Sequence, residues 1–228
     1  MTLVHLLLNI IFSVKHPGIE MHKYYFIITA AVVFACTQSP DTASRLVDIA
    51  QVNPNIILDI RYATTNNFLH EAVYPAARCF VLETVALRLD SVQRELETMG
   101  LGLKIFDGYR PYSVTRKMWE ILPDDRYVAN PSRGSRHNRG AAVDVTLTDS
   151  LGQELEMPTG FDDFSEKAGQ NYMDLPQHVI ENRVLLRDIM IKYGFTTIRT
   201  EWWHFDLKNY QKYPILDKSF EEIDLENL

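Results

Sequence analysis

Apolar residues recur every three or four positions along residues 82–99, which is the spacing of one face of a helix. Gly100 follows at a position where a glycine commonly ends a helix. A similar stripe on residues 176–193 predicts a second long helix, and residues 111–119 predict a shorter one that begins at a proline. The first stripe consists of Leu82, Val85, Ala86, Leu89, Val92, Leu96 and Met99.

Alternation with a period of two predicts a strand over residues 141–147, where every second residue is a large apolar one. Short apolar runs at residues 56–61, 103–106 and 198–207 predict three further strands. Residues 125–139 are polar and predict a long loop. Because helices and strands alternate irregularly, we expect an α+β fold, a single domain with a mainly antiparallel sheet flanked by helices.

The N-terminal region has a different pattern. Two apolar runs, residues 3–14 and 24–35, are each 12 residues long. A membrane-spanning helix needs about 20 residues, so neither run spans a bilayer comfortably alone. The second run follows a short basic start at Met21 and ends at Ala-Cys, which is the layout of a secretory or bacterial lipoprotein signal. A buried pair of short helices is the alternative interpretation.

This pattern divides the chain into three parts. We expect residues 1–36 to be a signal or lipoprotein-type leader, with Met21 as an alternative true start and Cys36 as the lipidated residue. Residues 37–45 contain Ser, Thr, Pro and Asp and are expected to be a tether. Residues 46–228 then form one folded domain.

Composition restricts the classes of function. Of the 228 residues, 46% are hydrophobic and 23% are charged, as in an ordinary folded protein, and the net charge is −7. An acidic chain gives no electrostatic reason to expect a nucleic-acid partner. The two cysteines, Cys36 and Cys79, exclude a disulfide framework and a cysteine-built zinc finger, so histidines and carboxylates must hold any metal. We expect Cys79 to be a small buried hydrophobe.

Two pairs of residues have the chemistry of a metal site. His137 and Asp144 stand seven positions apart, and alone they would be ordinary surface residues. Glu201 and His204 stand three positions apart in an aromatic segment. A catalytic zinc ion takes three protein ligands and leaves a fourth position for water. His137, Asp144 and His204 would supply these three ligands, and Glu201 would remain as a base beside the metal.

The spacing of the second pair also predicts a local irregularity. Residues three apart in a regular strand point to opposite faces of the sheet. Glu201 and His204 can therefore face one metal only if the strand bulges or turns between them.

These motifs carry a family resemblance. The pattern Ser-x-His-x-x-Gly-x-Ala-x-Asp at residues 135–144, followed by Glu-x-x-His at residues 201–204, resembles the zinc D-alanyl-D-alanine metallopeptidases. The stretches Asp-Gly-Tyr-Arg-Pro at residues 107–111 and Glu-Trp-Trp-His-Phe at residues 201–205 are similar to the D-alanyl-D-alanine dipeptidase branch, known from VanX-type vancomycin resistance. The likeness runs from about residue 47 to about residue 217.

The resemblance implies one zinc ion per chain, bound by His137, Asp144 and His204. It implies Glu201 as the catalytic base and Arg110 as the residue that stabilises the transition state. It also implies that Tyr62, Asp107 and Asp162 lie at the substrate site. The reaction would be hydrolysis of the D-Ala-D-Ala dipeptide to D-alanine.

The expected partner is therefore a small D,D-dipeptide, with membrane contact only through the leader or its lipid and no prediction of oligomeric state. An envelope location, periplasmic and lipid-anchored at Cys36, would suit recovery of D-alanine during peptidoglycan turnover; a cytoplasmic location is the alternative.

Two other functions stay open. One is a zinc D,D-carboxypeptidase that trims peptidoglycan stem peptides with the same metal site and a more open cleft. The other is an inactive, zinc-stabilised binding module, which could dispense with Glu201 and Arg110 although the chain has both.

Overall fold

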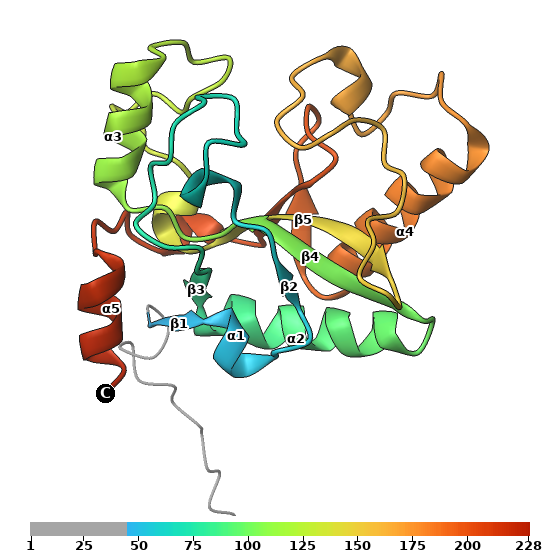
Figure 1. The fold of residues 1–228 in the computed structure, drawn as a ribbon, viewed down its shortest axis with the longest axis horizontal. Helices are drawn as coiled ribbons and strands as arrows, with labels where there is room; N and C mark the ends of the chain where they lie inside the picture. The colour runs from blue at the N-terminus through green and yellow to red at the C-terminus, as the bar shows by residue number, and fades with distance from the viewer. Residues whose placement is uncertain (1–44) are drawn as a thin grey trace, which may run out of the picture. The chain divides into compact units, whose positions relative to one another are not determined.

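A five-stranded sheet organises the structure, a computed structural model that describes residues 45–228 (Figure 1). All neighbouring strands are antiparallel except β2 and β4, which are parallel. This arrangement confirms the predicted α+β fold with a mainly antiparallel sheet. In spatial order the strands are β2 (Ile57–Leu58), β4 (Leu101–Asp107), β5 (Ala142–Asp149), β7 (His204–Leu207) and β6 (Phe195–Thr197).

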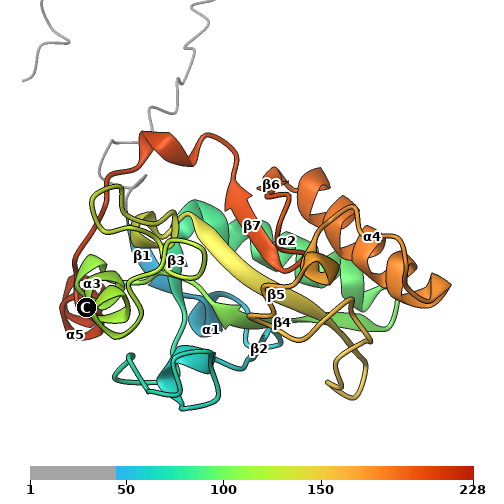
Figure 2. The ribbon, with the colours of Figure 1, turned by 90° about the horizontal axis from the view of Figure 1, so that it is seen from above.

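The three predicted helices are present as α2 (Glu83–Glu97), α3 (Tyr112–Ile121) and α4 (Gln177–Lys192). Helix α2 packs against β4 and ends before Gly100, whose φ of 71° is the left-handed conformation expected there. Helix α4 packs against β6 and β5. In Figures 1 and 2 α2 lies beneath the sheet, while long loops rise on the opposite side.

Strand β5 separates the core from this loop-covered side. Val143, Val145 and Leu147 are fully buried on one face of the strand. Asp144 and Thr146 alternate with them and are also buried, so both faces of the strand are covered. The polar face of β5 is thus shielded from bulk water, which is the setting in which charged side chains interact most strongly.

Short elements that the pattern did not predict complete the fold. Strand β1 (Leu46–Asp48) pairs with β3 (Phe80–Leu82), and α1 (Ile49–Val52) and α5 (Phe220–Glu226) are short helices. Single 3₁₀ turns lie at Arg61–Ala63, His137–Arg139, Glu166–Ala168 and Tyr210–Lys212. The Arg78 guanidinium bonds both Asp48 and Asp224, at 2.8 and 2.6 Å, and so joins β1 to α5.

Two strand predictions need correction. The run at residues 56–61 forms only a two-residue strand, because its second half turns into the 3₁₀ turn at Arg61–Ala63. The run at residues 198–207 is not one strand, since only its last four residues form β7. The preceding residues 198–203 form an irregular connection from β6, which confirms the predicted break between Glu201 and His204.

The leader, residues 1–36, and all of the tether except Arg45 lie outside the described residues. Within residues 45–228, no helix combines the length and apolarity needed to cross a bilayer. Cys79 is 1% exposed, which confirms its prediction as a buried hydrophobe.

Candidate metal centre and active site

Three neighbouring strands place a row of ionisable side chains on the sheet. In the strand register, Asp107 of β4 lies opposite Asp144 of β5, and Asp144 lies opposite His204 of β7. The register shifts between Ile105 and Asp107, and such irregularities redirect side chains next to active sites. Strand pairing therefore brings together residues that are 37 and 60 positions apart in the sequence.

His137 reaches this row from a 3₁₀ turn that precedes β5. Gly140 ends the turn with a φ of 62°, a left-handed conformation that favours glycine. The backbone amide of Arg110 donates to the His137 carbonyl at 3.2 Å. The fully buried Asn138 side chain donates to the Arg110 carbonyl and to Thr115 Oγ1, both at 2.8 Å. These contacts fix the turn that carries His137 to the segment that follows β4.

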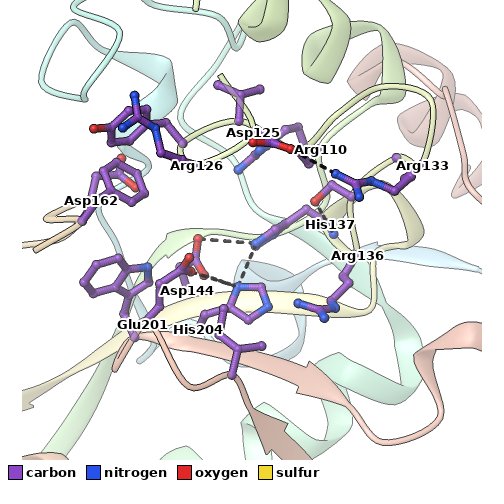
Figure 3. A pocket seen from close by; sticks show the side chains of 18 of the residues that line it. Arg110, Asp125, Arg126, Arg133, Arg136, His137, Asp144, Asp162, Glu201 and His204 are labelled. Atoms are coloured by element: carbon purple, nitrogen blue, oxygen red, sulfur yellow. Dashed lines mark hydrogen bonds and ion pairs between the residues drawn. The ribbon is translucent and has the colours of Figure 1, made fainter. Parts of the chain in front are cut away.

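The two histidines and Asp144 meet at one point (Figure 3). His137 Nε2 lies 3.3 Å from His204 Nδ1 and 3.5 Å from Asp144 Oδ2. Asp144 Oδ1 lies 2.9 Å from His204 Nδ1. One potential ligand atom from each residue falls within 4.8 Å of the others, and all three residues are buried. The structure thus assembles the three residues that the sequence motifs single out.

Outer hydrogen bonds orient both imidazoles. His137 Nδ1 lies 2.8 Å from the Gly108 carbonyl oxygen, and His204 Nε2 lies 2.9 Å from Asp206 Oδ1. These acceptors take the ring N–H groups and turn the other nitrogens toward each other, as outer partners of metal-binding histidines do. Gly108 has no room for a side chain, because a Cβ would lie 2.5 Å from Cys79 Sγ and 2.9 Å from the Phe80 carbonyl oxygen.

The charges around the cluster favour a cation. Burial lowers the pKa of His204, but the hydrogen bonds and charges of Asp144 and Asp206 outweigh burial and raise this pKa to about 10. The same ring would accept a metal ion in place of its Nδ1 proton. Ligands about 2.0–2.1 Å from a tetrahedral zinc ion lie about 3.3 Å apart, which is the separation of the two facing nitrogens. The donor set therefore fits zinc.

Glu201 stands beside this cluster in the irregular segment before β7. Its Oε2 lies 3.9 Å from His204 Nδ1, too far for a hydrogen bond, and its side chain is 26% exposed. Burial raises the pKa of Glu201 above its ordinary value. A carboxylate next to the ligand atoms, and free of strong hydrogen bonds, can exchange a proton with a reacting group.

The Arg110 side chain is held in place by Asp107, which lies behind it. Arg110 Nη2 donates to Asp107 Oδ2 at 2.6 Å, and the other Asp107 oxygen accepts from Tyr74 Oη at 2.6 Å and from the Gly108 amide at 2.9 Å. Asp107 is 0% exposed and is not among the residues that line the pocket, and its place at the substrate site stays a prediction. Both its oxygens are engaged in positioning neighbouring groups. Arg110 does line the pocket.

The pocket above the cluster has a volume of about 510 Å³ and contains Tyr62 and Asp162 in its wall. Tyr62 Oη donates to the Asp162 carboxylate, 3.1 Å from Oδ2 and 3.2 Å from Oδ1. Asp162 has a φ of 61°, whereas Asp163 is engaged with the Ser165 amide at 2.8 Å. Burial, and then the charge of Asp144, raise the pKa of Asp162 well above its ordinary value. Within residues 45–228 no cation forms an ion pair with this half-buried carboxylate, and the charge of Arg110 offsets the rise only in part.

Arginines form much of the remaining wall of the pocket. Arg126 and Arg133 are paired with neighbouring aspartates, and Arg139 donates to the Tyr213 carbonyl. Arg136 is held at its Nε by Asp206, 3.3 Å away, and stacks over the Tyr210 ring. Figure 3 places Asp162 and Arg136 on opposite sides of the cluster of His137, Asp144 and His204.

Comparison of the sequence with known protein families gives a match over most of the chain. Residues 42–224 match the family described as D-Ala-D-Ala dipeptidase. The chain belongs to the D-Ala-D-Ala dipeptidase family. The match covers all the residues of the cluster, the pocket and their supporting contacts.

Curated members of the D-Ala-D-Ala dipeptidase family are similar over most of their length. The chain is 36% identical over 177 residues to the D-alanyl-D-alanine dipeptidase of Escherichia coli K12, a match that covers 78% of this chain and 92% of the relative. It is 32% identical over 177 residues to that of Enterococcus faecalis, covering 68% and 87%. It is 33% identical over 171 residues to that of Streptomyces coelicolor, covering 66% and 85%.

Sequence reasoning missed three supporting residues of this D-Ala-D-Ala dipeptidase family member. Asp206, Asn138 and Gln170 are each at most 6% exposed and each bonds a segment that carries a site residue. Asp206 is two positions after His204 and so lies on the same face of β7, which was an available signal. Asn138 and Gln170 act through contacts between distant segments, and the sequence pattern contains no sign of them.

Proposed function

We propose that this protein is a zinc-dependent D,D-dipeptidase that hydrolyses D-alanyl-D-alanine to two molecules of D-alanine. The observation that carries the proposal is the convergence of His137, Asp144 and His204 in one pocket with Glu201 and Arg110. Named relatives with 32–36% identity support the choice of substrate.

The proposed metal is zinc, held by the two facing imidazole nitrogens and the Asp144 carboxylate. A set of two nitrogens and one oxygen suits zinc, and three protein ligands leave a position for a reactant. When bound, zinc would lower the pKa of water to roughly 7 and polarise a carbonyl group.

Glu201 is the proposed general base. Its carboxylate accepts a proton from water as the water attacks the peptide carbonyl, and then passes the proton to the leaving amino group. The raised pKa of Glu201 serves the second step, because a weaker acid retains the proton until the amine needs it.

Arg110 is proposed to face the negative charge that develops on the carbonyl oxygen. Its buried guanidinium is fixed by Asp107, and its Nε is buried without a partner among the described residues. A donor held in place before the reaction needs no reorganisation as the charge forms, and such a donor typically contributes about 3–4 kcal/mol to the transition state.

The two ends of a free dipeptide carry opposite charges, and each requires a partner when buried. We assign the ammonium group to Asp162, supported by Tyr62, since this half-buried carboxylate forms no ion pair within residues 45–228. The carboxylate is assigned to Arg136 rather than Arg139, whose guanidinium already donates to the Tyr213 carbonyl.

Metal analysis combined with turnover tests the proposal. We expect about one zinc per chain and release of D-alanine from D-Ala-D-Ala. Glu201→Ala should keep its zinc and lose about 10²–10⁴-fold in kcat, which is the usual contribution of a general base. A Glu201→Ala protein with wild-type turnover would refute the assigned role.

Acylated substrates distinguish a dipeptidase from a D,D-carboxypeptidase. An N-acetyl group removes the charge that Asp162 is proposed to bind, so we expect N-acetyl-D-Ala-D-Ala to be hydrolysed at least about 10-fold less efficiently than the free dipeptide. A preference for the acylated peptide would favour the carboxypeptidase. Zinc binding without hydrolysis of either substrate would indicate an inactive binding module.

We also propose an envelope location, with lipid attached at Cys36, on the basis of the leader-like pattern of residues 21–36. That location favours recovery of D-alanine from peptidoglycan turnover over removal of a cytoplasmic precursor. Intact mass and N-terminal sequence of the native protein test it. An unprocessed N-terminus would refute the lipid anchor.

A further inference from the structure

The segment that carries Glu201 has an unusual backbone. In an extended strand, consecutive carbonyl groups point to opposite edges. Here the carbonyl oxygens of Glu201 and Trp202 both accept from a single side-chain nitrogen, Gln170 Nε2, at 3.2 and 3.4 Å. Two successive carbonyls that converge on one donor mark the turn that separates Glu201 from β7. This turn allows Glu201 and His204, three residues apart, to face the same site.

Gln170 is well placed to hold this turn. It is 6% exposed, and its backbone amide donates to the Arg199 carbonyl at 3.0 Å. The preceding carbonyl, that of Gly169, accepts from Arg183 Nη1 at 3.1 Å, and Arg183 is a buried residue of α4. A rigid helix therefore anchors the loop from which Gln170 reaches the Glu201 segment.

The side-chain oxygen of Gln170 adds a second indication. Oε1 is buried and has no hydrogen-bond partner within residues 45–228. An unpaired buried acceptor destabilises a fold, and an apolar side chain of the same length would avoid that cost. The amide N–H group of Gln170 is thus the part of this side chain that the structure uses.

We propose that Gln170 is a positioning residue for catalysis. It holds the turn at Glu201 and Trp202 and thereby directs the Glu201 carboxylate toward the three proposed zinc ligands. The inference rests on the proposed role of Glu201 as the base. Without the amide donor, the segment is free to relax toward an extended strand, in which Glu201 and His204 would face opposite sides. Displacing a reacting group by about 1 Å can cost about 100-fold in rate.

Two substitutions of similar shape remove the donor. Gln170→Met keeps the length of the side chain and eliminates the unpaired oxygen, which offsets part of the cost of leaving the Glu201 and Trp202 carbonyls without this donor. Gln170→Glu places a carboxylate against two carbonyl oxygens. Gln177→Glu is the control, because Gln177 is exposed at the start of α4 and its side chain bonds Glu181 rather than any site residue.

With zinc-loaded full-length protein, we expect Gln170→Met and Gln170→Glu to lower kcat for D-Ala-D-Ala about 10–100-fold. KM and the zinc content should stay within about twofold of the wild type, and Gln177→Glu should change none of them. A loss of stability with unchanged kcat would make Gln170 a purely structural residue and overturn the proposal. A loss of zinc would overturn it as well, because the effect would then lie in the ligands.

Crystal structures of zinc-loaded wild type and Gln170→Glu separate this inference from the proposed function. We expect the variant to hold Glu201 farther from His204 than the wild type does, whatever substrate the enzyme uses. An unchanged Glu201 segment would refute the role of Gln170 even if D-Ala-D-Ala is the substrate. An enzyme inactive on D-Ala-D-Ala with a displaced Glu201 segment in the variant would refute only the proposed function.

Discussion

Replacing Asp107 by alanine would leave the Arg110 charge buried without its partner. Asp107 is 0% exposed, and the Arg110 side chain is 8% exposed. Breaking a buried ion pair on one side typically costs about 3–5 kcal/mol, because the remaining charge has neither water nor a counter-ion. For a domain of about 150–250 residues, 1 kcal/mol corresponds to about 2–4 °C in Tm, so we expect Tm to fall by about 6–20 °C.

A surface pair of equal length provides the control. Lys218 Nζ lies 2.6 Å from Glu226 Oε1, the same distance as in the buried pair, but the two side chains are 39% and 52% exposed. Solvent screens such a pair, and its contribution is about 0–1 kcal/mol. Glu226→Ala should therefore change the free energy of unfolding far less than Asp107→Ala.

Urea unfolding of the metal-free proteins measures both effects. Metal must be absent, because a ligand that binds only the folded state adds to the apparent stability. Trp202 and Trp203 are buried and provide a fluorescence signal of unfolding. A cost below about 1 kcal/mol for Asp107→Ala, or one equal to that of Glu226→Ala, would show that burial does not govern the energy of this pair.

Three further predictions concern the metal and the reaction. Because Gly108 is crowded, Gly108→Ala should displace the carbonyl that orients His137. Zinc binding should then weaken about 10–100-fold in a chelator competition assay. Gly160→Ala is the control, since Gly160 has open space around it and its substitution should not affect zinc binding. Arg110→Ala should lower kcat/KM about 10²–10³-fold with unchanged zinc content, and normal turnover would make this arginine purely structural. Without metal the pKa of His204 is about 10, so zinc must replace a proton on this ring. Zinc affinity should therefore rise about tenfold per pH unit between about pH 6 and 8. An affinity that does not depend on pH would contradict this exchange of a proton for zinc.

The long elements and the proposed metal ligands were predictable from the sequence for different reasons. Helix α2 and strand β5 follow periodic patterns over 15 and 8 residues, so local information was sufficient. The proposed metal ligands were chosen by their chemistry and by the motif. Their convergence depends on the register that places Asp144 opposite His204, a contact across 60 positions that no local pattern encodes.

Short elements and supporting contacts were harder to predict. Strands β1 and β3 have three residues each, too few to display a period. Helix α5 did have a usable signal, since Ser219 and Glu222 form a capping box at its start. Aromatic and β-branched residues favoured a continuous strand over residues 198–207, and the turn there is fixed instead by the distant Gln170.

Two of the proposed zinc ligands belong to β5 and β7, whereas much of the pocket wall comes from connecting segments such as residues 125–136 and 161–164. Groups on strands are held more accurately than groups on loops. These two ligands are therefore held independently of the segments that form much of the pocket wall. Grafting these two loops from a relative with another substrate should transfer its selectivity while the metal remains bound, which makes the sheet a reusable platform for engineering new peptidases.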